Sequence, residues 1–146
     1  MKETLDTRAY VSILKGLAED GHEVSMTIVG SSMSPFMIQG RDKIFFSKPD
    51  GALKRGDMVF YQRANGQFVM HRIIRVKDGG FYMVGDAQTE IEGPILREQI
   101  FAKITTVERK GKTLTEKDFW WRFFEGPWLC LLPLRNVISR LYGQIK

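Results

Sequence analysis

The residues best suited to chemistry begin with a serine-rich segment in the first quarter of the chain. Residues 29–36 read Val-Gly-Ser-Ser-Met-Ser-Pro-Phe, so small residues precede an apolar residue and a proline. A nucleophilic serine needs backbone close to the substrate carbonyl, an exposed hydroxyl and nearby N–H groups for the oxyanion. The segment could therefore hold a nucleophilic serine, although a serine-rich segment taken alone is more often only a turn.

Two further side chains could complete a hydrolytic site. His71 lies in Met-His-Arg-Ile-Ile at residues 70–74. An imidazole with an ordinary pKa of about 6.5 can accept a serine proton near neutral pH. A base of this kind works better with a third group that fixes its tautomer. Asp86 lies in the sequence Gly-Asp-Ala, which a turn after a strand would also explain. The second histidine, His22, is interpreted as structural.

The elements that must position these residues are mostly strands. Apolar residues at helical spacing predict a short amphipathic helix over residues 7–20, which Gly21 can end. Alternating apolar residues at 24–28 predict a strand that leads to the serine segment. Further strands are predicted at 43–47, 58–62, 68–76, 81–84 and 99–109, with turns at Asn65-Gly66 and at residues 78–80. The pattern predicts a mostly β fold, a compact antiparallel sheet or partly closed barrel.

The C-terminal part of the chain has a different composition. Six aromatic residues lie between Phe119 and Trp128, and beyond Pro133 the apolar residues fall on one helical face while Arg135 and Arg140 fall elsewhere. An aromatic and amphipathic helical tail is therefore expected at about residues 116–146. It could pack on the sheet, pack on a second copy in a homodimer, or make a peripheral contact with a membrane surface.

Length and composition narrow the class of protein. The 146 residues fit one domain, residues 1–146, and the net charge of +5 would permit contact with nucleic acid or an anionic membrane without choosing between them. The single cysteine, Cys130, lies in an apolar run, so we expect a buried thiol and no intrachain disulfide. With only two histidines besides, neither a metal nor another cofactor is expected.

No segment of the sequence has the features of a membrane anchor or a secretory signal. The longest stretch free of charge runs from Gly126 to Leu134 and is broken by two prolines, and the N-terminal residues lack an apolar core. The expected location is therefore cytoplasmic, or peripheral on the inner face of a membrane.

The order of several short motifs carries more information than any one of them. The motifs are Gly-Ser-Ser-Met-Ser-Pro at 30–35, Gly-Arg-Asp at 40–42, Arg-Gly-Asp-Met-Val-Phe-Tyr at 55–61, Val-Met-His-Arg-Ile-Ile at 69–74 and Gly-Asp-Ala at 85–87. In this order they resemble the signal peptidase I and SOS-repressor superfamily of serine proteases, over a catalytic core at about residues 24–107. Histidine at the position of the base resembles the endoplasmic-reticulum and archaeal branch rather than the lysine-bearing bacterial one.

The resemblance implies a role for each candidate residue. Ser32 would be the nucleophile, His71 the general base and Asp86 the acid that orients the base. The backbone N–H of Ser32 would bind the oxyanion, with Ser31 and Met33 at the neighbouring oxyanion or substrate-binding positions. Many signal peptidases add a serine hydroxyl two residues before the nucleophile, where this chain has glycine, so the second oxyanion donor stays open.

The matching aspartates at 42 and 57 are interpreted as structural residues that hold turns. The expected function is that of a serine endopeptidase that cleaves a peptide or precursor protein. The alternative is a catalytically silent module on the same fold that binds a peptide strand at a sheet edge. A nucleic-acid partner is not expected, because the sequence has no helix-turn-helix segment of the kind that repressors place before their protease domain.

Overall fold

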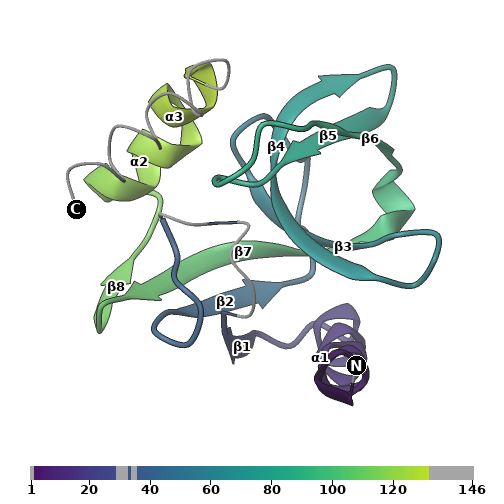
Figure 1. Cartoon of the computed structure of the whole chain (residues 1–146). Helices are drawn as coiled ribbons and strands as arrows, with labels where there is room; N and C mark the ends of the chain where they lie inside the picture. The colour runs from purple at the N-terminus through teal and green to yellow at the C-terminus, as the bar shows by residue number, and fades with distance from the viewer. Residues whose placement is uncertain (1, 29–32, 34–35, 132–146) are drawn as a thin grey trace.

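The computed structural model describes residues 2–28, 33 and 36–131, with side chains from residue 9 onward. An antiparallel sheet of eight strands forms its centre, with one helix at the N-terminal end and two short helices at the C-terminal end (Figure 1). The predicted mostly β fold with flanking helices is therefore confirmed. The sheet is open, because its path begins at β1 and ends at β6, and each of these strands pairs with one neighbour.

The elements follow the chain in a simple order. They are α1 (Lys2–Glu19), β1 (Val24–Thr27), β2 (Lys43–Ser47), β3 (Met58–Gln62), β4 (Phe68–Lys77), β5 (Gly80–Val84), β6 (Glu92–Ile95), the 3₁₀ turn η1 (Arg97–Gln99), β7 (Ile100–Arg109), β8 (Lys112–Leu114), α2 (Phe119–Glu125) and α3 (Pro127–Cys130). The strand order is β1-β2-β7-β3-β4-β5-β6, and β8 pairs with β7. Figure 1 shows β3 to β6 curving into one half of the molecule, with β1, β2, β7 and β8 in the other half.

Two tight turns set the register of the strands that carry the candidate site. Gly66, between β3 and β4, has a φ of 91°, which glycine adopts without strain. Between β4 and β5, Asp78 and Gly79 both have positive φ, at 52° and 77°, as a two-residue type I′ hairpin requires. Both hairpins predicted from the sequence are confirmed.

Side chains on the two faces of the sheet form two separate hydrophobic cores. Successive residues of a strand point to opposite faces. In β3, Met58 and Phe60 therefore enter a larger core, while Val59 and Tyr61 enter a smaller one. The larger core also holds buried residues from the helices and other strands, among them Val11, Leu14, Met26, Phe36, Met37, Ile44, Phe46, Ile104, Trp121, Phe124 and Trp128. The smaller core consists of Leu53, Val59, Tyr61, Val69, Ile73, Phe81, Met83, Ile95 and Ile100.

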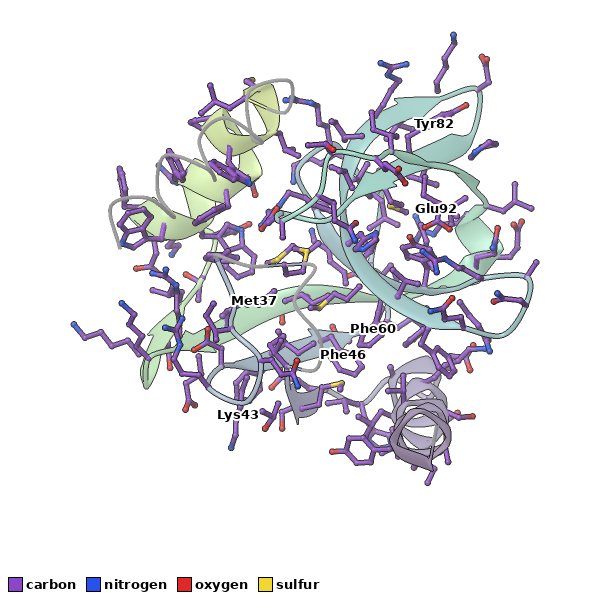
Figure 2. All side chains as sticks on the ribbon, viewed as in Figure 1. Met37, Lys43, Phe46, Phe60, Tyr82 and Glu92 are labelled. Carbon is purple, nitrogen blue, oxygen red and sulfur yellow. The ribbon has the colours of Figure 1, made fainter. Side chains whose placement is uncertain are left out.

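Aromatic contacts join the larger core across strands. The rings of Phe46 and Phe60 lie 5.5 Å apart, and Phe60 stacks on Phe101 at 5.2 Å (Figure 2). Phe36 contacts both Trp121 and Phe124, at 6.1 and 4.9 Å between ring centroids. The first helix of the tail therefore packs on the segment that follows the serine-rich region.

The observed elements differ from the sequence predictions in a few places. The first helix begins at Lys2 rather than at residue 7, and strands β6 and β8 were not predicted. Both strands lack a clear signal, because β6 contains glycine and proline and β8 has three residues. The expectation of a buried Cys130 was wrong, because α3 is a short helix that turns this side chain outward.

The first part of the expected tail is helical, as α2 and α3, and residues 132–146 lie outside the described part. Within the described part of the chain, none of the helices combines the length and the apolar character needed to cross a membrane.

Candidate active site

The structure describes only one of the three residues expected around the nucleophile. Ser31 and Ser32 lie outside the described residues, whereas Met33 is buried in the larger core. The Met33 carbonyl accepts a hydrogen bond from the N–H of Met37 at 3.0 Å. Because its side chain is fully used in packing, Met33 can offer a substrate only its backbone.

His71 lies on β4 with its side chain on the face of the smaller core, the same face as Val69 and Ile73. Only 5% of its surface is exposed. This burial lowers the pKa of His71 to about 4, with a further lowering from the charge of Arg63 and an opposing influence from Glu92. The imidazole is therefore neutral at physiological pH, as a base that accepts a serine proton must be.

A chain of polar contacts leads from His71 to a neighbouring ion pair. The Nδ1 atom of His71 lies 3.3 Å from the hydroxyl of Tyr61, and that hydroxyl donates a hydrogen bond to Oε1 of Glu92 at 2.8 Å. Arg63 donates to both oxygens of Glu92, at 2.7 and 2.8 Å. The strands β3, β4 and β6 each supply one member of this chain, and Figure 2 shows Glu92 within the curve formed by β3 to β6.

An open groove lies beside this chain. It has a volume of about 700 Å³ and is lined by Arg63, His71 and residues 87–93, which connect β5 to β6 and begin β6. The groove combines a neutral histidine with a mostly polar wall of backbone, amide and carboxylate groups.

In the structure, the carboxylate of Asp86 binds Arg72 and not His71, the partner expected from the sequence. Its two carboxylate oxygens accept hydrogen bonds from Nε and Nη2 of Arg72, both at 2.9 Å, and both side chains are fully buried. Arg72 also donates to the carbonyl of Gly56 at 3.0 Å, and the carbonyl of Asp86 accepts from Nε1 of Trp128 at 2.7 Å. Among the described contacts, none joins Asp86 to His71.

Strand geometry explains this departure. His71 and Arg72 are consecutive residues of β4, so their side chains point to opposite faces of the sheet. An aspartate that binds Arg72 through both oxygens is therefore on the wrong face to orient His71. The contacts of Asp86 are those of a buried structural ion pair.

The two aspartates interpreted as structural do hold turns. Asp42 accepts hydrogen bonds from the N–H groups of Ile38 at 2.8 Å and Lys110 at 3.0 Å, and Arg41 binds both of its oxygens. Asp57 accepts from the N–H of Lys54 at 3.0 Å, directly before β3. Both interpretations are confirmed.

Sequence reasoning missed Tyr61, Glu92 and Arg63. Val59 of β3 lies opposite His71 of β4, and Tyr61 is on the same face of β3 as Val59. The pairing of Val59 with His71 follows once the Gly66 hairpin has set the register of the two strands. Because side chains alternate between the two faces of a strand, the sequence carried a usable signal for Tyr61 once β3 and its hairpin were predicted. Glu92 carried none, because it lies in a strand that the sequence does not predict.

In the part of the chain that the structure describes, no three histidine, cysteine, aspartate or glutamate side chains come together as metal ligands.

The buried ion pair yields a first prediction. Asp86→Asn should lower the free energy of unfolding by about 3–5 kcal/mol, because it leaves the buried Arg72 guanidinium without a compensating charge. Urea denaturation measures this loss. Asp50→Asn, at an exposed site, is the matched control and should change little. Equal stability of Asp86→Asn and the parent would contradict the structural assignment of this pair.

The burial of His71 yields a second prediction. Its folded pKa is about 4 against an ordinary 6.5, so between these values the unfolded chain binds a proton that the folded chain does not. The part of the free energy of unfolding that depends on a neutral His71 is thus fully present above pH 6.5, and it is lost as the pH falls toward 4. Since one pKa unit corresponds to about 1.36 kcal/mol, the loss should approach about 3 kcal/mol.

The measurement compares urea unfolding of the parent and His71→Gln from pH 7.5 to 4. The difference between the two proteins should shrink as the pH falls, because only the parent has a histidine at 71 to protonate on unfolding. His22→Gln removes an exposed histidine and should follow the parent. A constant difference between the parent and His71→Gln across this range would rule out a buried neutral His71.

Comparison with protein-family models, with curated proteins and with solved structures finds no match to this chain.

Proposed function

We propose that this chain is a serine endopeptidase of the signal peptidase I kind, in which Ser32 is the nucleophile and His71 the general base. The observation that carries the proposal is a buried, neutral histidine at the wall of an open groove, with its Nδ1 atom already engaged by Tyr61. This leaves Nε2 as the nitrogen that can accept a proton. The motif order in the sequence supports the same assignment.

The proposed reaction follows the usual course of acyl transfer. Ser32 Oγ attacks the scissile carbonyl while His71 accepts its proton, and the backbone N–H of Ser32 binds the oxyanion. The imidazolium then donates that proton to the leaving amine as the peptide bond breaks. Water, deprotonated by the same histidine, hydrolyses the acyl-enzyme and releases Ser32. In this proposal, Asp86 supports the fold through Arg72 and does not act on the base.

The alternative of a catalytically silent peptide-binding module has one observation in its favour. Strand β6 is at the end of the sheet path and begins in the wall of the groove, so a peptide could pair with its free edge. Pro94 removes one N–H donor from this strand, which weakens it as a template. The alternative also leaves the burial of a neutral histidine without a use.

A peripheral membrane contact is proposed for the helical tail. Helix α2 exposes Phe119 at 68% and Trp120 at 46% of their surfaces, and the guanidinium of Arg109 lies 5.5 Å from the ring of Trp120. Exposed aromatic rings beside basic side chains suit the headgroup region of a bilayer. The proposed location is cytoplasmic, or peripheral on the inner face of a membrane, and the proposed substrate is a peptide or precursor protein.

A serine-directed probe tests the proposed catalysis. A fluorophosphonate should label the parent. Ser32→Ala should abolish the labelling, because it removes the hydroxyl that reacts, and His71→Ala should lower the labelling rate by at least about 10²-fold, the usual contribution of a general base. Ser47→Ala, on β2, is the matched control. Labelling should stay near its maximum from pH 8 down to about 5 and fall only toward pH 4, since the pKa of His71 is about 4. Unchanged labelling of Ser32→Ala would exclude Ser32 as the nucleophile.

Vesicle sedimentation tests the proposed membrane contact. The parent should bind vesicles containing phosphatidylserine more than neutral vesicles, and added salt should weaken this binding by screening the basic charges. The double variant Phe119→Ser/Trp120→Ser should reduce the bound fraction severalfold. The control Leu96→Ser, at an exposed site outside the helical tail, should leave the bound fraction unchanged. If the parent ignores anionic vesicles at low salt, the aromatic pair has another partner, and loss of a dimer in the double variant would identify a second copy.

A further inference from the structure

The direction of the hydrogen bonds between Glu92, Tyr61 and His71 can be worked out from their donors. A tyrosine hydroxyl has a single proton to donate, and a carboxylate can only accept. The 2.8 Å contact between Tyr61 and Glu92 must therefore use the Tyr61 proton. In the 3.3 Å contact with His71, the Tyr61 oxygen is then left as the acceptor, so His71 Nδ1 must be the donor.

The neighbouring charges favour donation from Tyr61 to Glu92 over donation from Tyr61 to His71. The two hydrogen bonds from Arg63 lower the pKa of Glu92, so Glu92 stays an ionised acceptor. A hydrogen bond to an ionised group is roughly twice as strong as one between neutral groups. Burial, together with the adjacent Glu92 carboxylate, raises the pKa of Tyr61, which keeps its proton at physiological pH. The shorter contact is also the one to Glu92.

We infer that Tyr61 and Glu92 are positioning residues that hold His71 as the tautomer protonated on Nδ1, with Nε2 free to accept a proton. Arg63 keeps Glu92 in place for this purpose. The inference deepens the proposed function and depends on it for its catalytic meaning, because Nε2 would be the atom that takes the proton of Ser32. The arrangement does for His71 what the expected Asp86 contact would have done, with a tyrosine placed between the carboxylate and the imidazole.

The inserted tyrosine has a chemical consequence. A carboxylate in direct contact with an imidazole both fixes the tautomer and stabilises the imidazolium that forms during the reaction. Here Tyr61 separates the Glu92 carboxylate from the imidazole of His71. The tautomer is therefore fixed, while the carboxylate stabilises the imidazolium less than it would in direct contact. This agrees with the balance found at His71, where burial outweighs the influence of Glu92.

The tautomer can be read directly by nitrogen NMR, without any assay of activity. The chain has two histidines, so in a His22→Gln background the only imidazole nitrogen signals are those of His71. At pH 7, ¹⁵N-labelled protein should show Nδ1 as the protonated nitrogen and Nε2 as the unprotonated one. The opposite pattern, with the proton on Nε2, would overturn the inference, and this measurement needs no variant of Tyr61 or Glu92 to fold.

Variants then test the role of each partner. In Glu92→Ala, the Tyr61 proton can turn toward His71, so the population should shift toward the tautomer protonated on Nε2. In Tyr61→Phe the acceptor is gone, and a mixture of tautomers is expected. Glu98→Ala and Tyr82→Phe, which lie outside the groove, are the matched controls and should keep the parent spectrum. A parent-like spectrum in both folded variants of Glu92 and Tyr61 would also overturn the inference.

Activity distinguishes failure of this inference from failure of the proposed function. With a peptide substrate, Glu92→Ala should lower kcat at least about tenfold with little change in KM, because the wrong tautomer cannot act as the base. If His71 is protonated on Nδ1 but Ser32→Ala does not affect cleavage, the proposed function fails and the tautomer assignment stands. If cleavage requires Ser32 but His71 is protonated on Nε2, the proposed function stands and the inference fails.

Discussion

The buried ion pair between Arg72 and Asp86 is the interaction on which much of the structure depends. Taking two charges out of water costs several kcal/mol per ion, and this cost is recovered only when the geometry is good and the remaining donors are satisfied. Arg72 meets that requirement through both oxygens of Asp86 and the carbonyl of Gly56, while its guanidinium lies 5.6 Å from the ring of Phe36. The indole of Trp128 binds the Asp86 carbonyl. One charge pair therefore joins β4, the ends of two loops and the C-terminal helices.

Fixing Arg72 on one face of β4 also fixes His71 on the other. On that second face, burial lowers the pKa of the imidazole, and the ion pair of Arg63 and Glu92 supplies the nearest charges. In the proposed reaction, the same burial that keeps His71 neutral would also oppose the imidazolium that forms during acyl transfer. If Glu92 acts on His71 through Tyr61, as we propose, it would orient the imidazole without raising the pKa of His71 to its ordinary value, which is a compromise between these two demands.

Much of the fold could be predicted because its signals are local. Alternation of apolar residues indicated β1, and short apolar runs separated by turn signals indicated β2 to β5 and β7. The Asn65-Gly66 and Asp78-Gly79 pairs indicated the hairpins, where Gly66, Asp78 and Gly79 have positive φ. The turn roles of Asp42 and Asp57 followed from the same kind of reasoning. Strands β6 and β8 could not be predicted, because a sequence with proline or only three residues becomes a strand only when a neighbouring strand offers it hydrogen bonds.

By itself, the sequence determined the order of the strands along the chain, the positions of the turns and the candidates Ser32, His71 and Asp86. Which side chains meet was decided by the tertiary structure. His71 and Arg72 are neighbours in sequence, yet the pleat sends them to opposite faces, so Asp86 binds Arg72 and Tyr61 meets His71. Glu92 reaches this group from β6, whose pairing with β5 no local pattern predicts. Periodicity shows which residues share a face of a strand, but only the packing of several strands determines which partner a buried polar group finds.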